Sequence, residues 1–111
     1  LQALLEIVRP LHPALIYLAQ GDVRGALERV AAERPPEWRA FVGAYTDRGA
    51  WAQATGQRGF EGFIAALEIR QSVERSFLAR SGLPHLVVDV TDWEWRAEQE
   101  RVAGFLQEAW L

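Results

Sequence analysis

Arginine supplies every basic side chain in this 111-residue sequence, because its twelve basic residues include no lysine. A guanidinium group bridges phosphate oxygens through parallel N–H groups and stabilises the charge on a phosphoryl group in transfer. Four arginines stand at positions suited to that chemistry, in the helix after an apolar segment or flanking a stretch that contains three separate glycines: Arg24, Arg29, Arg48 and Arg58. The alternative for each is a solvated helix face, with i,i+4 ion pairs such as Arg70 with Glu74.

Polar side chains lie at the end of the second apolar segment of the sequence. Asp89 lies near the end of that segment, and Thr91 and Asp92 follow it. Open α/β sheets bind ligands at the carboxyl ends of their strands, so these three side chains are candidate ligand contacts. Two alternatives stay open: Asp89 bonds to a loop amide or a helix start, and Thr91 begins a Thr-x-x-Glu capping box. No metal site is predicted, because neither histidine has the spacing of one.

Two apolar runs, 14–18 and 86–90, predict the strands that position these residues. Both runs are continuous rather than alternating, which is typical of parallel strands covered on both faces. The connection from residue 19 to residue 85 is too long for a hairpin and ample for a right-handed crossover. We therefore expect an α/β protein with two parallel strands joined by a long helical crossover.

Helical spacing accounts for most of the remaining sequence. The expected helices cover, approximately, residues 1–8, 23–34, 36–45, 60–81 and 93–110. Asp22 is placed to cap the second of these helices, and Gly82 to end the long one. Residues 46–59 are the least regular stretch and predict either a mobile loop or a weak helix. In the third helix a stripe at i, i+3, i+4 and i+7 is expected to be buried: Trp38, Phe41, Val42 and Tyr45.

The overall composition excludes several classes of protein. A net charge of −3 argues against general nucleic-acid binding, which depends on dense positive charge. The absence of cysteine excludes disulfides, thiolate metal sites and cysteine nucleophiles, and it suits a cytoplasmic protein. No apolar run approaches the roughly 18 residues of a membrane span, so no membrane partner is expected.

The two strands predict a sheet larger than this sequence can supply. A pair of strands buried on all sides leaves backbone N–H and C=O groups that are costly to keep dry, so further strands should flank them. The sequence also lacks methionine, so we expect residues upstream of Leu1. We therefore interpret residues 1–111 as one partial domain, with the missing N-terminal half of the same domain as its partner.

Three segments resemble P-loop nucleotide kinases, the thymidylate-kinase-like group especially. Pro13-Ala-Leu-Ile-Tyr-Leu-Ala-Gln-Gly-Asp-Val-Arg-Gly-Ala-Leu-Glu-Arg29 is similar to their fourth strand, with its acidic turn and Val-x-x-Ala-Leu-x-Arg helix. Arg58-Gly-Phe-Glu-Gly-Phe63 resembles the passage from lid to helix. Leu86-Val-Val-Asp-Val-Thr-Asp92 resembles the last strand and the loop beside the adenine. The resemblance covers nearly the whole chain, as the C-terminal half of such a domain.

The resemblance implies a helix-rich segment of a three-layer α/β/α P-loop-type fold, with a lid-like region over residues 35–59. It implies ATP-dependent phosphoryl transfer to a nucleotide, nucleoside or similar small acceptor. ATP and Mg²⁺ would be bound mainly by residues that this chain lacks. The implied catalytic residues are Arg29 and Arg58. The implied nucleotide-binding residues are Arg24, Arg48, Asp89, Thr91 and Asp92.

By this interpretation the chain alone has no kinase activity, and its partners are a small-molecule nucleotide and, as an option, a second copy in a homodimer. Two alternatives of other classes remain at this point. One is a non-catalytic helical module that binds a partner protein through exposed tryptophans. The other is a degenerate P-loop domain that binds nucleotide or serves as a scaffold.

Overall fold

The structure is a computed structural model that describes residues 2–91 and 95–110. The chain forms two compact units. One unit comprises Leu1–Gly21 and Glu74–Leu111, and the other comprises Asp22–Val73. The fold is mixed α/β and mostly helical.

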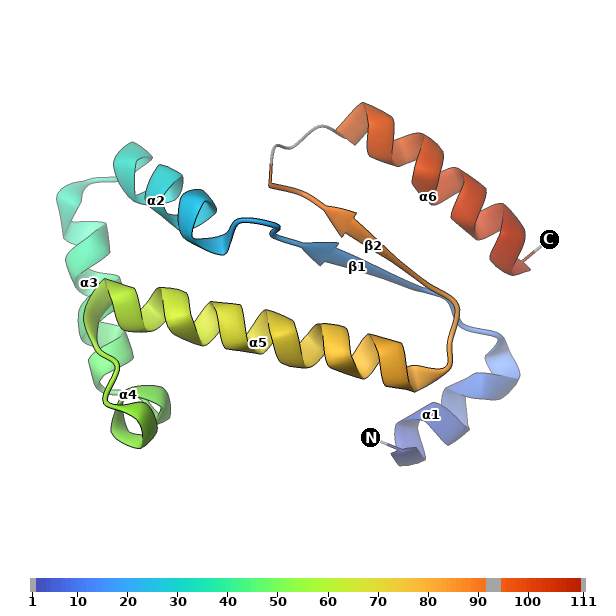
Figure 1. Ribbon diagram of the computed structural model, residues 1–111, viewed down its shortest axis with the longest axis horizontal. Coiled ribbons are helices and arrows are strands. Elements are labelled where there is room, and N and C mark those ends of the chain that lie inside the picture. The colour runs from blue at the N-terminus through green and yellow to red at the C-terminus, as the bar shows by residue number, and fades with distance from the viewer. Residues whose placement is uncertain (1, 92–94, 111) are drawn as a thin grey trace. The chain divides into compact units, whose positions relative to one another are not determined.

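The first unit contains a two-stranded sheet. Its strands β1 (Leu15–Ala19) and β2 (His85–Asp89) pair in parallel, with Leu15 opposite His85 and Ala19 opposite Asp89. Figure 1 shows the two arrows side by side and pointing the same way. The expected parallel pairing is therefore confirmed, and each strand is displaced by one residue from its expected range.

Helices at both ends of the chain complete this unit. The chain begins with α1 (Gln2–Val8) and the 3₁₀ turn η1 (Arg9–Leu11), where Pro10 stops the α-helix as expected. The last helix, α6 (Trp95–Trp110), contacts β2. The Nε1 of Trp110 donates a hydrogen bond of 3.0 Å to the carbonyl of His12, which ties the end of α6 to the segment before β1.

The sheet is covered unevenly. Leu18 and Val88 are opposite each other in the register, so their side chains lie on the same face. Val88 has no exposed surface, whereas 52% of Leu18 is exposed, and Ile16 is exposed on that face too. The expectation that both strands are buried on both faces is therefore not met by β1 in this chain, because Ile16 and Leu18 keep much of their surface exposed.

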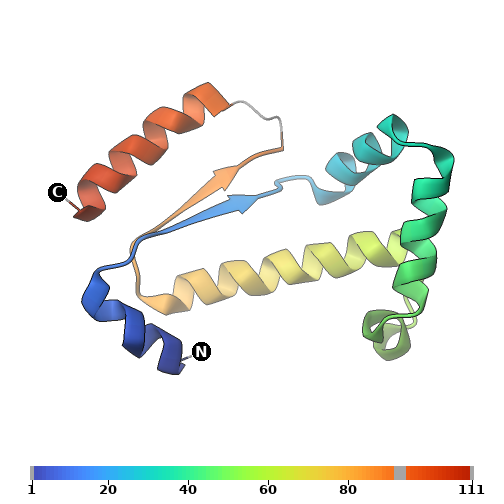
Figure 2. The same cartoon turned by 180° about the vertical axis from the view of Figure 1, so that it is seen from behind.

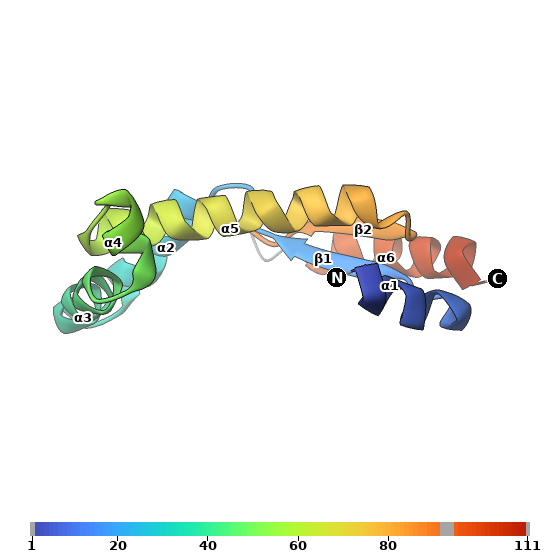
Figure 3. The same cartoon turned by 90° about the horizontal axis from the view of Figure 1, so that it is seen from below.

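The second unit is entirely helical in its described elements. It contains α2 (Val23–Glu33), α3 (Pro36–Asp47), α4 (Ala50–Thr55) and the beginning of α5 (Gly59–Ser81). Figure 2 shows α3 running across the beginning of α5, and Figure 3 shows the short α4 against the end of α3. The irregular stretch 46–59 thus includes both a short helix and loop, and the long helix ends before Gly82, whose φ of 70° is the expected left-handed cap.

A small apolar core holds these helices together. Val42, Phe60 and Ile64 are buried at its centre, and partly buried side chains surround them: Val23, Leu27, Ala31, Trp38 and Phe63. The α3 backbone comes close to the beginning of α5 at Gly43, where an added Cβ would lie 3.3 Å from the Cα of Gly59. Glycine at this position therefore allows the two helices to approach.

The apolar stripe expected in α3 is only partly correct. Trp38 and Val42 face the core, but Phe41 is 64% exposed and Tyr45 is 67% exposed. The buried line continues instead through Thr46, whose Oγ1 donates to the carbonyl of Val42 at 2.9 Å. The spacing is correct for a helix, but the close contact at Gly43 rotates α3 so that the two aromatic rings point to the solvent.

Candidate functional site

The carboxyl ends of β1 and β2 are joined by a cluster of short hydrogen bonds. Asp89 Oδ1 accepts from the Thr91 hydroxyl at 2.6 Å and from the Thr91 N–H at 2.9 Å. The Gly21 N–H, at the turn after β1, donates to Thr91 Oγ1 at 2.8 Å and to Asp89 Oδ1 at 3.2 Å. Of the alternatives for Asp89, the contact with a loop amide is the one that the structure contains.

This cluster stabilises the charged form of Asp89. The hydroxyl of Thr91 contributes most to lowering the pKa of the carboxyl, followed by the backbone N–H groups of Thr91 and Gly21. Gly21 has little space, since an added Cβ would lie within contact distance of the same carboxylate. The carboxyl edge of the sheet therefore contains a fixed anion whose oxygen is already engaged by the protein.

The lowered pKa of Asp89 predicts a loss of stability in acid. A carboxyl whose folded pKa lies below its ordinary value of about 3.9 stabilises the fold fully above that value and loses the effect as pH falls through the folded pKa. Asp89→Asn should lower the Tm at neutral pH. The difference in Tm between the variant and the wild type should disappear once the pH falls below the folded pKa of Asp89. Thermal unfolding between roughly pH 2 and 7 measures it. A difference in Tm that stays constant in acid contradicts the prediction. The control is Thr91→Ser, which keeps the hydroxyl that donates to Asp89.

Arg24 and Arg58 line one shallow hollow in the second unit. The hollow has a volume of about 300 Å³, and its other lining residues are Gln57, Glu61, Gly62 and Ala65. Arg24 comes from the first turn of α2, and Arg58 from the loop that leads into α5. The fold therefore brings together two of the four candidate arginines, which are far apart in the sequence.

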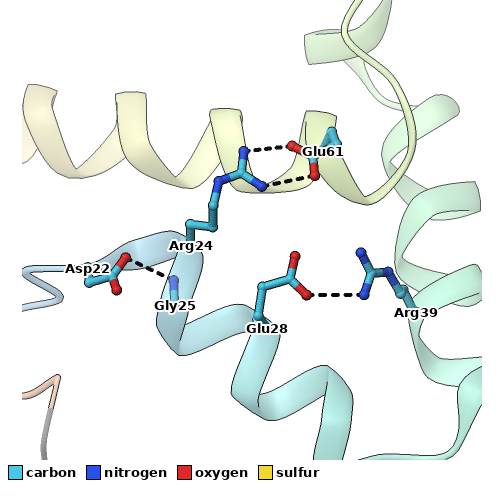
Figure 4. A network of polar contacts seen from close by, with 6 residues as sticks. All are labelled: Asp22, Arg24, Gly25, Glu28, Arg39 and Glu61. Carbon is cyan, nitrogen blue, oxygen red and sulfur yellow. Dashed lines mark hydrogen bonds and ion pairs between the residues drawn. The ribbon is translucent and has the colours of Figure 1, made fainter.

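Arg24 is held by Glu61 in a fork. Its Nη1 and Nη2 donate to the two carboxylate oxygens of Glu61 at 2.9 and 2.6 Å (Figure 4). The hydrogen bond and the charge of Glu61 raise the pKa of Arg24, and the same bond lowers the pKa of Glu61. Both side chains are more than half exposed, so water screens this pair strongly. Glu61 already occupies the guanidinium face that a phosphate would use.

A second arginine, Arg39, lies near this pair. Its Nη1 donates to Glu28 at 3.1 Å (Figure 4), and its guanidinium lies 4.4 Å from the ring centroid of Phe60. Arg39 also lines a hollow of about 540 Å³ along α3 with Pro36, Ala40, Gly43, Ala44, Asp47, Gly59 and Phe60. At the end of that hollow, Asp47 Oδ1 accepts from the Gly59 N–H at 2.7 Å and fixes the beginning of α5.

The remaining candidates lie elsewhere. Arg29 is exposed on α2, and Arg48 is the exposed residue that caps the end of α3. Neither lines the hollow that contains Arg24 and Arg58. Asp92 lies outside the described residues, as does most of the proposed capping box. Asp22 caps α2 as expected, with its Oδ1 accepting from the Gly25 N–H at 2.9 Å.

Glu61 and Arg39 were not predicted from the sequence. Glu61 lies in the first turn of α5, where an acidic residue commonly stabilises the helix dipole, so a capping role explains it without any partner. Its pairing with Arg24 spans 37 positions and depends on how α2 packs against α5. Arg39 has no turn, glycine or strand end beside it in the sequence to mark it.

Two further features concern only the described part of the chain. Within residues 2–91 and 95–110, no group of three or more His, Asp or Glu side chains is placed to hold a metal ion. The same part of the chain contains no helix with the length and apolar character needed to cross a membrane. Mg²⁺, which the resemblance implies, thus has no ready ligand set among these side chains.

Comparisons with protein-family models, with curated proteins and with solved structures gave no match to this chain. The assignment of a function therefore depends on the geometry described above.

Proposed function

We propose that this chain is the C-terminal lid and nucleotide-side portion of a P-loop nucleotide-kinase-like phosphotransferase, within a three-layer α/β/α domain. One observation carries the proposal: β1 and β2 are adjacent and parallel, and the whole connection between them is made of helices and short loops. An antiparallel hairpin, or helix at either strand, would have contradicted it. Asp89 ends β2 at the edge where open α/β sheets bind ligands, which supports it further.

Arg58 and Arg24 are the residues best placed for the lid role, since they line one hollow. In the proposal their guanidinium groups neutralise phosphate oxygens during transfer, where a single such donor accounts for about 10²- to 10³-fold in kcat. Arg24 must first leave Glu61. Arg29 and Arg48 keep their proposed catalytic and binding roles, although neither lines that hollow. Asp89 and Thr91 form part of the wall beside the base, together with Asp92.

ATP and Mg²⁺ enter this proposal as groups bound mainly by residues outside the chain. The described residues do not offer a metal site, so no step is assigned to the ion. What this chain supplies is positive charge from its arginines and a rigid carboxyl edge, where Gly21 and Thr91 hold Asp89 in place. These are positioning and electrostatic contributions.

An ADP-release assay with a panel of nucleotide acceptors tests the proposal. The chain alone should give no turnover. The polypeptide that includes the residues encoded upstream of Leu1 should turn over, and those residues should contain a glycine-rich loop that ends in Lys-Ser or Lys-Thr. In that polypeptide Arg58→Ala should lower kcat by about 10²-fold or more, while the exposed Arg96→Ala on α6 serves as the control. Turnover by the chain alone, or an upstream region without such a loop, overturns the proposal.

A second candidate function is a non-catalytic interaction module. The observation in its favour is the exposure of Phe41 and Tyr45 on α3. The tryptophans expected to serve this role are less available, since Trp38 and Trp51 are half-buried and Trp110, though exposed, donates to His12. A longer polypeptide that neither binds nucleotide nor turns over, but binds another protein through α3, would favour this function.

A further inference from the structure

The outer face of α3 carries one unbroken exposed stripe. Glu37, Phe41, Ala44 and Arg48 follow one another at spacings of four, three and four residues, and all four are exposed. These spacings are those of a heptad seam, the pattern with which one helix packs along another. The opposite face of α3 contacts the core through Val42, so the seam is not needed for the folding of the unit.

The seam is complementary to a second copy of itself that runs in the opposite direction. When two copies of α3 are placed antiparallel about a two-fold axis between Phe41 and Ala44, Phe41 of each copy lies opposite Ala44 of the other. Glu37 of each copy then lies opposite Arg48. The large ring meets a methyl group, and the carboxylate meets a guanidinium, at every layer of the pair.

This symmetry is the property that an isologous dimer requires, since the same patch must serve as both halves of the contact. We propose that the seam Glu37, Phe41, Ala44 and Arg48 binds a second copy of this chain, as an antiparallel α3–α3 pair. Tyr45, beside the seam, covers one edge of the contact. The occupant is a second copy rather than an unrelated helix because both the charge order and the size order complement this same helix.

The contact has a limited size. A helix of 12 residues with two apolar layers buries little surface, and interfaces under about 1,200 Å² belong to weak or transient complexes. We therefore expect a dimer that forms with rising concentration and is weakened by salt, since the two Glu37–Arg48 pairs lie at the exposed ends of the contact. The dimer shares Arg48 with the phosphotransferase proposal, but it uses none of the residues that line the hollow of Arg24 and Arg58. Self-association of the chain can therefore succeed or fail whether or not the longer polypeptide transfers phosphate.

Sedimentation equilibrium on the full chain, from roughly 1 µM to 1 mM, tests the proposal by reversal of charge. Glu37→Arg and Arg48→Glu should each weaken self-association by about tenfold, because each replaces two attractive pairs with two repulsive ones. An equimolar mixture of the two variants should associate again, since both seam arginines of one variant then lie opposite seam glutamates of the other. The double variant should also regain wild-type association.

Two apolar substitutions complete the design. Phe41→Ser should abolish association, whereas Ile69→Ser, which changes a similarly exposed side chain on α5, should leave it unchanged. Circular dichroism of every variant checks that it is folded. A wild-type chain that stays monomeric up to about 1 mM overturns the proposal, and so does a dimer that the mixture of charge variants fails to restore. A monomer whose α3 binds another protein would overturn it too, and would assign the seam to a different partner.

Discussion

Ile64→Ala is expected to lower the free energy of unfolding by about 2 to 5 kcal/mol. Ile64 has no exposed surface and lies at the centre of the second unit, with Val42 and Phe60. Its truncation removes the transfer free energy of the lost carbons and leaves a cavity that the surrounding helices cannot fully close. Since small natural domains are stable by only about 5 to 15 kcal/mol, a loss of this size is a large share of the total.

Urea unfolding measures this prediction, followed by circular dichroism for the helices and by tryptophan fluorescence for the packing near Trp38. Trp38 lies edge to face with Phe60, its ring centroid 6.1 Å away, so the part of the emission that comes from Trp38, one of five tryptophans, reports on the same core. The matched control is Ile69→Ala, the same chemical change on the same helix at a side chain that is 51% exposed. It should cost no more than about 0.5 kcal/mol, and equal costs at the two sites would contradict the packing described for α5.

Much of the fold could be predicted because local signals agreed with the tertiary structure. The continuous apolar runs marked both strands, and the length of their connection favoured a parallel pairing. Asp22 and Gly82 were placed by helix-capping chemistry that acts within a few residues. Signals of this short range survive folding largely unchanged, so a single sequence is enough to interpret them.

The orientation of α3 could not be predicted in the same way. Helical spacing of Phe41 and Tyr45 with Trp38 and Val42 gives an apolar surface too wide for one small core. In the structure only part of that surface is buried. Gly43 lets α3 pack closely against Gly59, and in this orientation the rings of Phe41 and Tyr45 face the solvent. That outcome depends on backbone contact between residues 16 positions apart, which periodicity does not encode.

In the candidate sites, the sequence marked individual residues but not the partners that the fold brings to them. Arg24 was selected because it follows the first strand, and Arg58 because it flanks a stretch that contains several glycines. One hollow is lined by both of them. The partner of Arg24 was missed, because a fork with Glu61 needs α2 and α5 to be packed first. For Asp89 the sequence left open a ligand, a loop amide or a helix start, and only the pairing of β1 with β2 brings the Gly21 amide within reach.

Val88→Asp is expected to lower the free energy of unfolding by about 3 to 5 kcal/mol, since it places an unpaired charge where no surface is exposed. Its matched control is Leu18→Asp, because Leu18 is the register partner of Val88 on the same sheet face and is 52% exposed. In this chain the Leu18 variant should cost no more than about 1 kcal/mol. Urea unfolding followed by circular dichroism compares the two, and similar costs would contradict the uneven cover of the sheet.

The same pair of variants connects the sheet to the proposed function. In a three-layer domain of the proposed type, helices cover both faces of the sheet, so Leu18 should be buried in the longer polypeptide. In that longer polypeptide Leu18→Asp should cost about as much as Val88→Asp, which is about 3 to 5 kcal/mol. A cost that stays below about 1 kcal/mol there would mean that the exposed half of this face belongs to the native surface, and the three-layer α/β/α interpretation would fail.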